Sequence, residues 1–255
     1  MKLIVSARRM LVVCAMAGAS TAALSGQSAA RAEAGRGIAW QTSLQKASAV
    51  AVPANKPILL EFWANWCPPC KVMDAEVYTD ADVKKAMAKL VPVRVDVDKQ
   101  GTLAREYDVT GMPTLVFGDS YGNELFRFSG TITKSAMMKL LDELPRDVTN
   151  INQLSRILAK DKDNFEALAD MGRTLRAAGL FRTSNDYYAR ALQQRDAKAD
   201  AGLREAILHN MGANYLEVKE GNKAAQIFER CLKEFPASPH RAEWTANLAR
   251  ARALQ

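Results

Sequence analysis

The chain has 255 residues, of which 48% are hydrophobic and 25% are charged. This composition is typical of folded soluble proteins and excludes disorder as the default, and the length fits one large domain or two ordinary ones. A formal net charge of +7 could suit a nucleic acid, but four basic and no acidic residues lie in residues 1–32, which leaves +3 for the rest. We therefore expect no nucleic-acid partner.

Residues 1–32 have the pattern of a secretory signal peptide. A basic segment ends at Arg9, an apolar run extends from Met10 to Leu24, and small residues flank Arg31 as cleavage sites. The apolar run is shorter than the roughly 20 residues that span a bilayer, which disfavours the alternative of a retained membrane anchor. We expect an exported protein with no stable membrane insertion after cleavage.

Three cysteines remain after the leader, namely Cys67, Cys70 and Cys231. In an oxidising compartment disulfides persist, but three cysteines cannot all pair within one chain. One close pair and one distant cysteine therefore indicate two working thiols and a structural residue.

Residues 33–145 alternate between strand and helix patterns after a polar stretch at residues 35–55. In chain order we expect a buried strand at 58–63, a helix at 80–90, a strand at 91–97, a helix at 102–107, strands at 114–117 and 125–128 around a turn at 118–123, and a helix at 134–144. This order predicts an α/β sandwich built on a small mixed sheet.

Residues 146–255 have only helical periodicity. Two segments match the spacing of tetratricopeptide repeats, although Gly172 and Gly212 lie 40 residues apart rather than about 34. Residues 196–201 would be an inserted connection, and residues 148–160 and 241–254 would be packing or capping helices. Ser184 and Lys219 depart from the repeat pattern. The first segment has Leu168, Met171, Gly172, Leu175, Gly179, Tyr188 and Ala191, and the second has Leu208, Met211, Gly212, Tyr215, Ala224, Phe228, Cys231 and Pro236.

The segment Trp66-Cys67-Pro68-Pro69-Cys70 follows the first strand and opens a helix. A thiol does redox chemistry as a thiolate, and the N–H groups and dipole of a helix N-terminus lower its pKa. Cys67 is therefore the expected nucleophile, and Cys70, one helical turn further on, is the expected resolving thiol. Prolines at the start of a helix interrupt no hydrogen bond and stiffen the turn.

This segment, with Lys71 after it, and the later run Gly111-Met112-Pro113-Thr114 together resemble the thioredoxin superfamily, over roughly residues 38–144. The details are most similar to the C-terminal thioredoxin-like domain of the DsbD reductases, which act in the bacterial periplasm. The resemblance implies a thioredoxin fold, followed here by an all-α tetratricopeptide-repeat domain, and a periplasmic location. It also implies that Pro113 is a cis proline facing the dithiol and that a substrate chain pairs with the backbone beside it.

By the same resemblance, Met112 shapes substrate access, and the substrate-binding surface comprises Trp66, Pro68, Pro69 and Met112. The sequence pattern alone gives Pro113 only a role at the start of a strand.

Glu61 lies in the apolar strand, six residues before Cys67. An unpaired carboxylate there would be costly and would tend to keep its proton. Thioredoxin-like proteins place an acid at this position to move the proton of the resolving cysteine, so the resemblance makes Glu61 the acid/base partner of Cys70. The alternative is an edge-strand glutamate that faces solvent or pairs with a base such as Arg94.

A zinc site is the structural rival for Cys67 and Cys70. Closed zinc sites take about four ligands, and the sequence has no second Cys pair. Cys231 fits a packed core position, and His209 and His240 fit surface or capping positions. We therefore expect no metal site and no cofactor.

The Pro-Pro spacer lacks the histidine that contributes to strongly oxidising pairs, which favours a protein-disulfide reductase. Its expected partners are exported proteins that contain disulfides and, as electron donor, a membrane thiol reductase of the DsbD or CcdA kind. The helical domain would bind clients or partner proteins. Two alternatives remain, an exported oxidase or isomerase and a repeat-based assembly factor or holdase.

Overall fold

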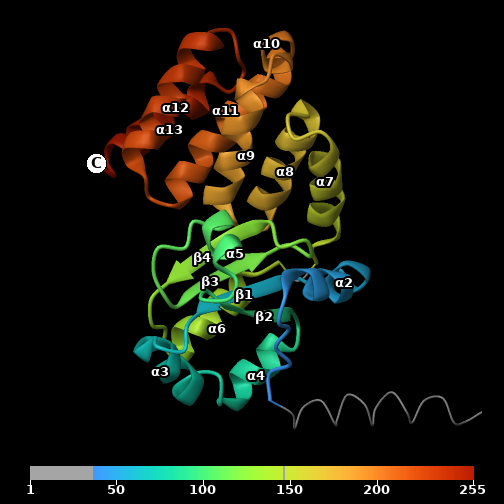
Figure 1. Cartoon of the computed structure of the whole chain (residues 1–255). Helices are drawn as coiled ribbons and strands as arrows, with labels where there is room; N and C mark the ends of the chain where they lie inside the picture. The colour runs from blue at the N-terminus through green and yellow to red at the C-terminus, as the bar shows by residue number, and fades with distance from the viewer. Residues whose placement is uncertain (1–36, 146) are drawn as a thin grey trace, which may run out of the picture. The chain divides into compact units, whose positions relative to one another are not determined.

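The computed structural model describes residues 37–145 and 147–255, and residues 37–255 form one unit by their contacts (Figure 1). The expected signal peptide lies outside the described residues. Among the helices that are described, none combines the length and the apolar character that crossing a bilayer requires.

The first part of the chain contains a four-stranded mixed sheet with the order β2-β1-β3-β4. Strand β1 lies parallel to β2 and antiparallel to β3. Strand β4 pairs with β3 in antiparallel orientation. All four expected strands are confirmed, with ends that differ by about one residue. The strands are β1 (Ile58–Trp63), β2 (Val91–Asp96), β3 (Thr114–Gly118) and β4 (Glu124–Ser129).

Helices cover both faces of this sheet. Helices α2 and α5 pack on the face of Ile58, Leu60 and Phe62, whereas α3, α4 and α6 pack on the face of Leu59 and Leu115. Alternate residues of β1 thus face different layers, as strand geometry requires. The helices are α2 (Leu44–Ala54), α3 (Pro68–Glu76), α4 (Ala81–Met87), α5 (Gly101–Glu106) and α6 (Lys134–Glu143).

Helix α2 is absent from the sequence-based expectations, which treat residues 35–55 as a polar stretch. Ser43 caps its N-terminus by accepting a hydrogen bond from the Lys46 N–H. Its buried residues are Ala47 and Ala51. Leu44 packs against the same cluster and is partly buried. A helix whose interface is mostly small alanines shows only a weak apolar stripe in the sequence.

The rest of the chain is helical, and its helices pack as neighbouring pairs (Figure 1). Helix α8 packs on α9, and α11 packs on α12. The segment expected to be an insertion contains the short helix α10. The helices are α7 (Thr149–Lys160), α8 (Phe165–Ala177), α9 (Phe181–Gln193), α10 (Asp196–Ala199), α11 (Ala201–Glu217), α12 (Gly221–Glu234) and α13 (Arg241–Arg252).

The two pairs make the same close contact at a glycine. A Cβ atom on Gly172 would lie 2.4 Å from the Tyr188 ring, and one on Gly212 would lie 2.7 Å from the Phe228 ring. Gly172 and Gly212 are 40 residues apart, and so are Tyr188 and Phe228. The spacing seen in the sequence therefore corresponds to a repeated helix-helix contact.

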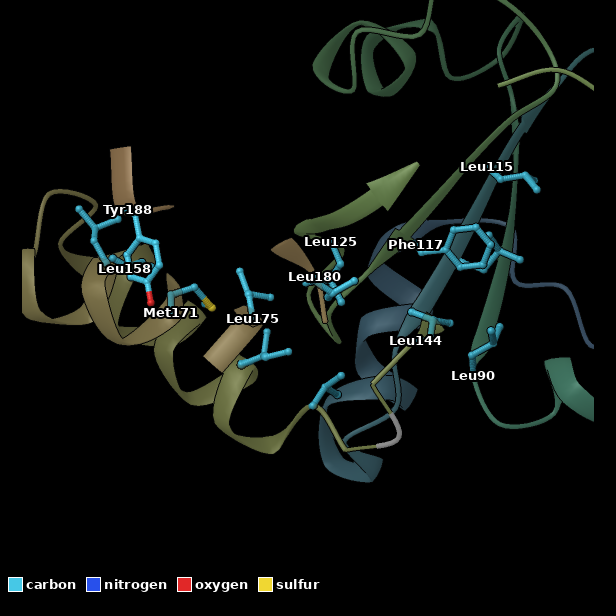
Figure 2. Packing of buried hydrophobic residues seen from close by; sticks show 14 of the residues in the cluster. Leu90, Leu115, Phe117, Leu125, Leu144, Leu158, Met171, Leu175, Leu180 and Tyr188 are labelled. Atoms are coloured by element: carbon cyan, nitrogen blue, oxygen red, sulfur yellow. The ribbon is translucent and has the colours of Figure 1, made fainter. Parts of the chain in front are cut away.

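The helical part joins the sheet at the β3–β4 turn. Figure 2 shows Leu125 and Leu180 close together within one buried apolar cluster that runs through both parts. Buried polar groups join them as well: the Ser155 hydroxyl donates to the Asp119 carboxylate at 2.6 Å, and the Ser120 N–H donates to Asn152 Oδ1 at 3.1 Å.

This junction lies at the far end of the sheet from the cysteine pair. Gly118, just before the turn, pairs with Ile58 at the start of β1, whereas Cys67 follows the end of β1. The Ser120 hydroxyl also donates to the carbonyl of Lys56, which precedes β1. Within the part of the chain that the structure describes, the helical part thus contacts the end of the sheet opposite Cys67.

We predict that Gly172→Ala and Gly212→Ala each lower the free energy of unfolding by about 1–3 kcal/mol, because the new methyl group overpacks a buried ring. Urea unfolding followed by circular dichroism measures the change. Gly202→Ala is the matched control, since its nearest neighbour would be Asp200 Oδ1 at 3.6 Å in a helical position. Equal stabilities for all three variants would contradict the close contact.

Candidate active site

Cys67 and Cys70 form a disulfide with a Cα–Cα distance of 5.4 Å. Cys67 is the N-cap of α3, and its sulfur accepts a hydrogen bond from the Cys70 N–H at 3.2 Å. Prolines occupy the first two helical positions, as expected. In the reduced protein, this N–H and the helix dipole are placed to stabilise a thiolate on Cys67.

The peptide bond between Met112 and Pro113 is cis. Met112 packs against the small cluster that contains Cys67 and Cys70. Thr114, the first residue of β3, pairs with Phe62 near the end of β1. The loop that carries Pro113 is therefore placed beside the cysteines, as the resemblance implies.

The other residues expected to bind substrate surround the cysteine pair at the surface. Trp66 is 63% exposed, and its indole N–H donates to the Asp98 carboxylate at 3.0 Å. Pro68 is exposed, whereas Pro69 and Met112 are half-buried. Because Cys67 itself is buried except for 3% of its surface, a substrate has to approach across these side chains.

Glu61 is fully buried in the central strand β1. The alternative that places it on an edge strand facing solvent is therefore wrong, whereas the pairing with Arg94 is present: Arg94 Nε donates to Glu61 Oε2 at 2.8 Å. The other carboxylate oxygen, Oε1, is buried without a hydrogen-bond partner among the described residues. Burial raises the pKa of Glu61 to about 7, against the lowering effect of Arg94.

Arg94 connects Glu61 to the helix that carries Cys70. Its terminal nitrogen donates to Asp74 at 2.6 Å. Asp74 lies four residues after Cys70 on α3, and residues at this spacing share a helix face. Glu61 therefore lies on the same side of the sheet as Cys70, with Arg94 and Asp74 between the strand and the helix. The sequence pattern identified Arg94 only as an alternative partner and did not identify Asp74.

Three aromatic rings enclose the Arg94 guanidinium group. Its central carbon lies 5.0 Å from the Trp40 ring centroid, 4.7 Å from that of Trp63 and 5.9 Å from that of Tyr78. Burial and the nearby Glu61 raise the pKa of Tyr78, so its hydroxyl stays neutral. Cation–π contacts and two carboxylates thus hold Arg94 in place. Trp40 and Tyr78 carry no motif in the sequence that points to this role.

Cys231 lies in the helical part and is fully buried, as expected for a packed residue. Burial raises the pKa of its thiol to about 12. A thiol with this pKa remains protonated at neutral pH and is a poor nucleophile. Among the described cysteines, Cys67 and Cys70 are therefore the candidates for thiol chemistry.

Residues 39–143 match the family model described as Thioredoxin. A thioredoxin of Mycobacterium bovis is 36% identical over 100 residues, which cover 39% of this chain and 80% of that protein. The thiol:disulfide interchange protein DsbD of Yersinia enterocolitica is 32% identical over 108 residues, covering 40% of this chain but only 19% of DsbD. The solution structure of a Thermus thermophilus thioredoxin aligns at 26% identity with a TM-score of 0.39, covering 42% of this chain and 87% of that one.

We predict that Glu61 makes the stability of the protein depend on pH. Its pKa is about 7 in the folded state and near 4.5 when unfolded, so between these values only the folded state keeps the proton. The free energy of unfolding should fall as the pH rises from 4.5 to 7, by up to about 3 kcal/mol, and then level off. Urea unfolding at a series of pH values measures this decline.

Glu61→Gln removes the titrating group and should flatten the decline over the same pH window. Glu76→Gln, at the exposed last position of helix α3, is the matched control and should keep the wild-type profile. Parallel profiles for Glu61→Gln and the wild type would show that the buried carboxyl does not cause the pH dependence.

Proposed function

Because the chain belongs to the thioredoxin family and carries its Cys-x-x-Cys pair, we propose that it is a protein-disulfide reductase acting on exported proteins. The observation that carries the proposal is the placement of Cys67 at the N-cap of α3, with the Cys70 N–H directed at its sulfur. Exposed Trp66 and half-buried Met112 would provide the apolar surface on which a client docks.

The proposed reaction starts from the reduced dithiol. The Cys67 thiolate attacks one sulfur of a client disulfide, so a mixed disulfide forms and the client's other sulfur leaves as a thiolate that takes a proton. Cys70 then loses its proton and attacks the Cys67 sulfur. The Cys67–Cys70 disulfide forms and the second client thiol is released. Two electrons pass from the protein to the client.

Glu61 is the proposed base for the Cys70 proton. A pKa of about 7 suits a group that exchanges protons near neutral pH. The chain of contacts from Glu61 through Arg94 to Asp74 places it beneath the helix that carries Cys70. Pro113, in its cis peptide, is the proposed site where a client backbone pairs.

The resemblance to the DsbD reductases favours reduction as the direction of electron flow, and a DsbD is among the similar proteins. The Pro-Pro spacer supports it too, because it lacks a histidine that would over-stabilise the thiolate. A reduced dithiol needs an electron donor in an oxidising compartment, so we assign this role to a membrane thiol reductase of the DsbD or CcdA kind. The pattern of residues 1–32 supports export to the periplasm through a cleaved signal peptide.

We assign residues 33–145 to the thioredoxin-like domain and residues 146–255 to a tetratricopeptide-repeat domain that binds clients or partner proteins. The contacts between Gly172 and Tyr188 and between Gly212 and Phe228 support the repeat assignment, since they recur after 40 residues. Gly179 and Lys219 show the same spacing, and both have a positive φ, of 80° and 58°. Lys219 thus occupies a loop position that favours glycine.

Trapping tests the enzymatic proposal. In Cys70→Ala the resolving thiol is missing, so clients should accumulate as mixed disulfides on Cys67 when the exported protein is isolated under non-reducing conditions. The double variant Cys67→Ala/Cys70→Ala is the control and should capture none. An empty trap in cells that supply a reduced donor would exclude the reductase.

The redox potential distinguishes reduction from the alternative of an oxidase or isomerase. We expect the Cys67–Cys70 pair to equilibrate with glutathione near thioredoxin's potential, about −270 mV. A potential near about −120 mV, as in DsbA, would instead identify an oxidant. A holdase or assembly factor is a third candidate, and it would keep its activity when both cysteines are replaced by serine.

A further inference from the structure

The two histidines of the chain are 31 residues apart in sequence and lie side by side in the structure. His209 comes from the middle of α11, and His240 is the N-cap of α13. Their ring centroids are 5.3 Å apart. Glu243, in the first turn of α13, contacts both: its Oε2 lies 3.5 Å from His240 Nδ1 and its Oε1 lies 3.8 Å from His209 Nε2.

We propose that His209, His240 and Glu243 form a binding site for a divalent transition-metal ion, which we assign as Zn²⁺. One ligand atom from each residue lies within 4.8 Å of the others. Four ligands at about 2.1 Å around a tetrahedral zinc ion lie roughly 3.4 Å from one another. Small side-chain rotations would therefore bring the three groups into coordination.

The chemistry of this set favours zinc over the hard ions. Two imidazoles with one carboxylate match the nitrogen and oxygen ligands of zinc, whereas Mg²⁺ and Ca²⁺ prefer oxygen alone. Three protein ligands leave a fourth position for water or an outside ligand.

The surroundings provide room for the ion. A cavity of about 210 Å³ lies beside the two rings, and Glu205 and Asn210 are among its lining residues. Before zinc binds, fully buried Trp244 donates its indole N–H to His209 Nδ1 at 3.0 Å, which orients the ring. The hydrogen bond also means that neutral His209 carries its proton on Nε2, the atom that faces Glu243.

Zinc bound at Nε2 requires the His209 proton to move to Nδ1. The hydrogen bond from Trp244 to His209 is then lost. This loss weakens the affinity for zinc, and it also changes the environment of the indole ring. Tryptophan fluorescence should therefore report binding. The ion would link α11 to α13, which packs mainly on α12 and whose buried residues are Trp244, Leu248 and Ala251.

The test uses the full chain with the Cys67–Cys70 disulfide intact, because reduced thiolates bind zinc themselves. Zinc is titrated by calorimetry and by tryptophan fluorescence. We expect one zinc ion per chain, a change in fluorescence and no response to Mg²⁺. His240→Ala and Glu243→Gln alter exposed or half-exposed positions and should each raise the Kd by more than about tenfold.

Glu217→Gln, at an exposed position of α11, is the matched control and should leave the Kd unchanged. Circular dichroism confirms that each variant keeps its helices. Unchanged zinc affinity in both ligand variants would overturn the site, as would the absence of heat and of a fluorescence change up to about 1 mM zinc. If only the reduced protein bound zinc, the ion would be on the cysteines, and the proposed histidine site would be overturned.

Discussion

A carboxylate buried in the central strand is the constraint around which the active end of this protein is organised. Glu61 has no access to solvent, and an ionised group in such a place requires a partner. Arg94, which pairs with Glu61 on β2, supplies the positive charge. The Arg94 side chain in turn needs contacts that fix its position. Trp40, Trp63 and Tyr78 enclose the guanidinium group, and Asp74 binds its free end. The contacts of Trp40, Tyr78 and Asp74 tie segments outside the sheet to β1 and β2.

The sheet separates redox chemistry from the helical part. The C-terminal end of β1 leads into the cysteine pair, whereas the β3–β4 turn at the other end accepts α7 through Asp119 and Ser120. Buried polar groups are costly unless all are bonded, so this junction tolerates few alternative arrangements. A client at Cys67 and a protein bound to the helices would therefore occupy different ends of the molecule.

Close helix packing organises the rest of the chain. At Gly172 and Gly212 the absence of a side chain lets an aromatic ring of the next helix approach the backbone. The buried Asn214 side chain donates to Ser184 Oγ at 2.9 Å and to Asn185 Oδ1 at 2.8 Å, which links the two helix pairs. The same packing brings His209, His240 and Glu243 together at the junction of α11 and α13.

The sequence by itself determined the features that local chemistry controls. These are the buried strand at 58–63, the cysteine pair at a helix start, the succession of strands and helices, and the 40-residue spacing of the helical part. The first three depend on residues that are near one another in the chain, and the fourth is a local pattern that recurs. The placement of Pro113 in a cis peptide came from family resemblance, because the run Gly111 to Thr114 alone indicates no more than the start of a strand.

Only the tertiary structure decided which distant residues meet. The sequence pattern does not predict helix α2, because its fully buried residues are alanines. Asp74 and Trp40 contact Arg94 because the strand register places Arg94 beside Glu61. The sequence pattern assigns the two histidines to surface or capping positions, because their proximity depends on how α11 packs against α13. Strand pairing and helix packing join residues that lie tens of positions apart in the sequence. A local pattern of side chains does not predict which of these distant residues come into contact.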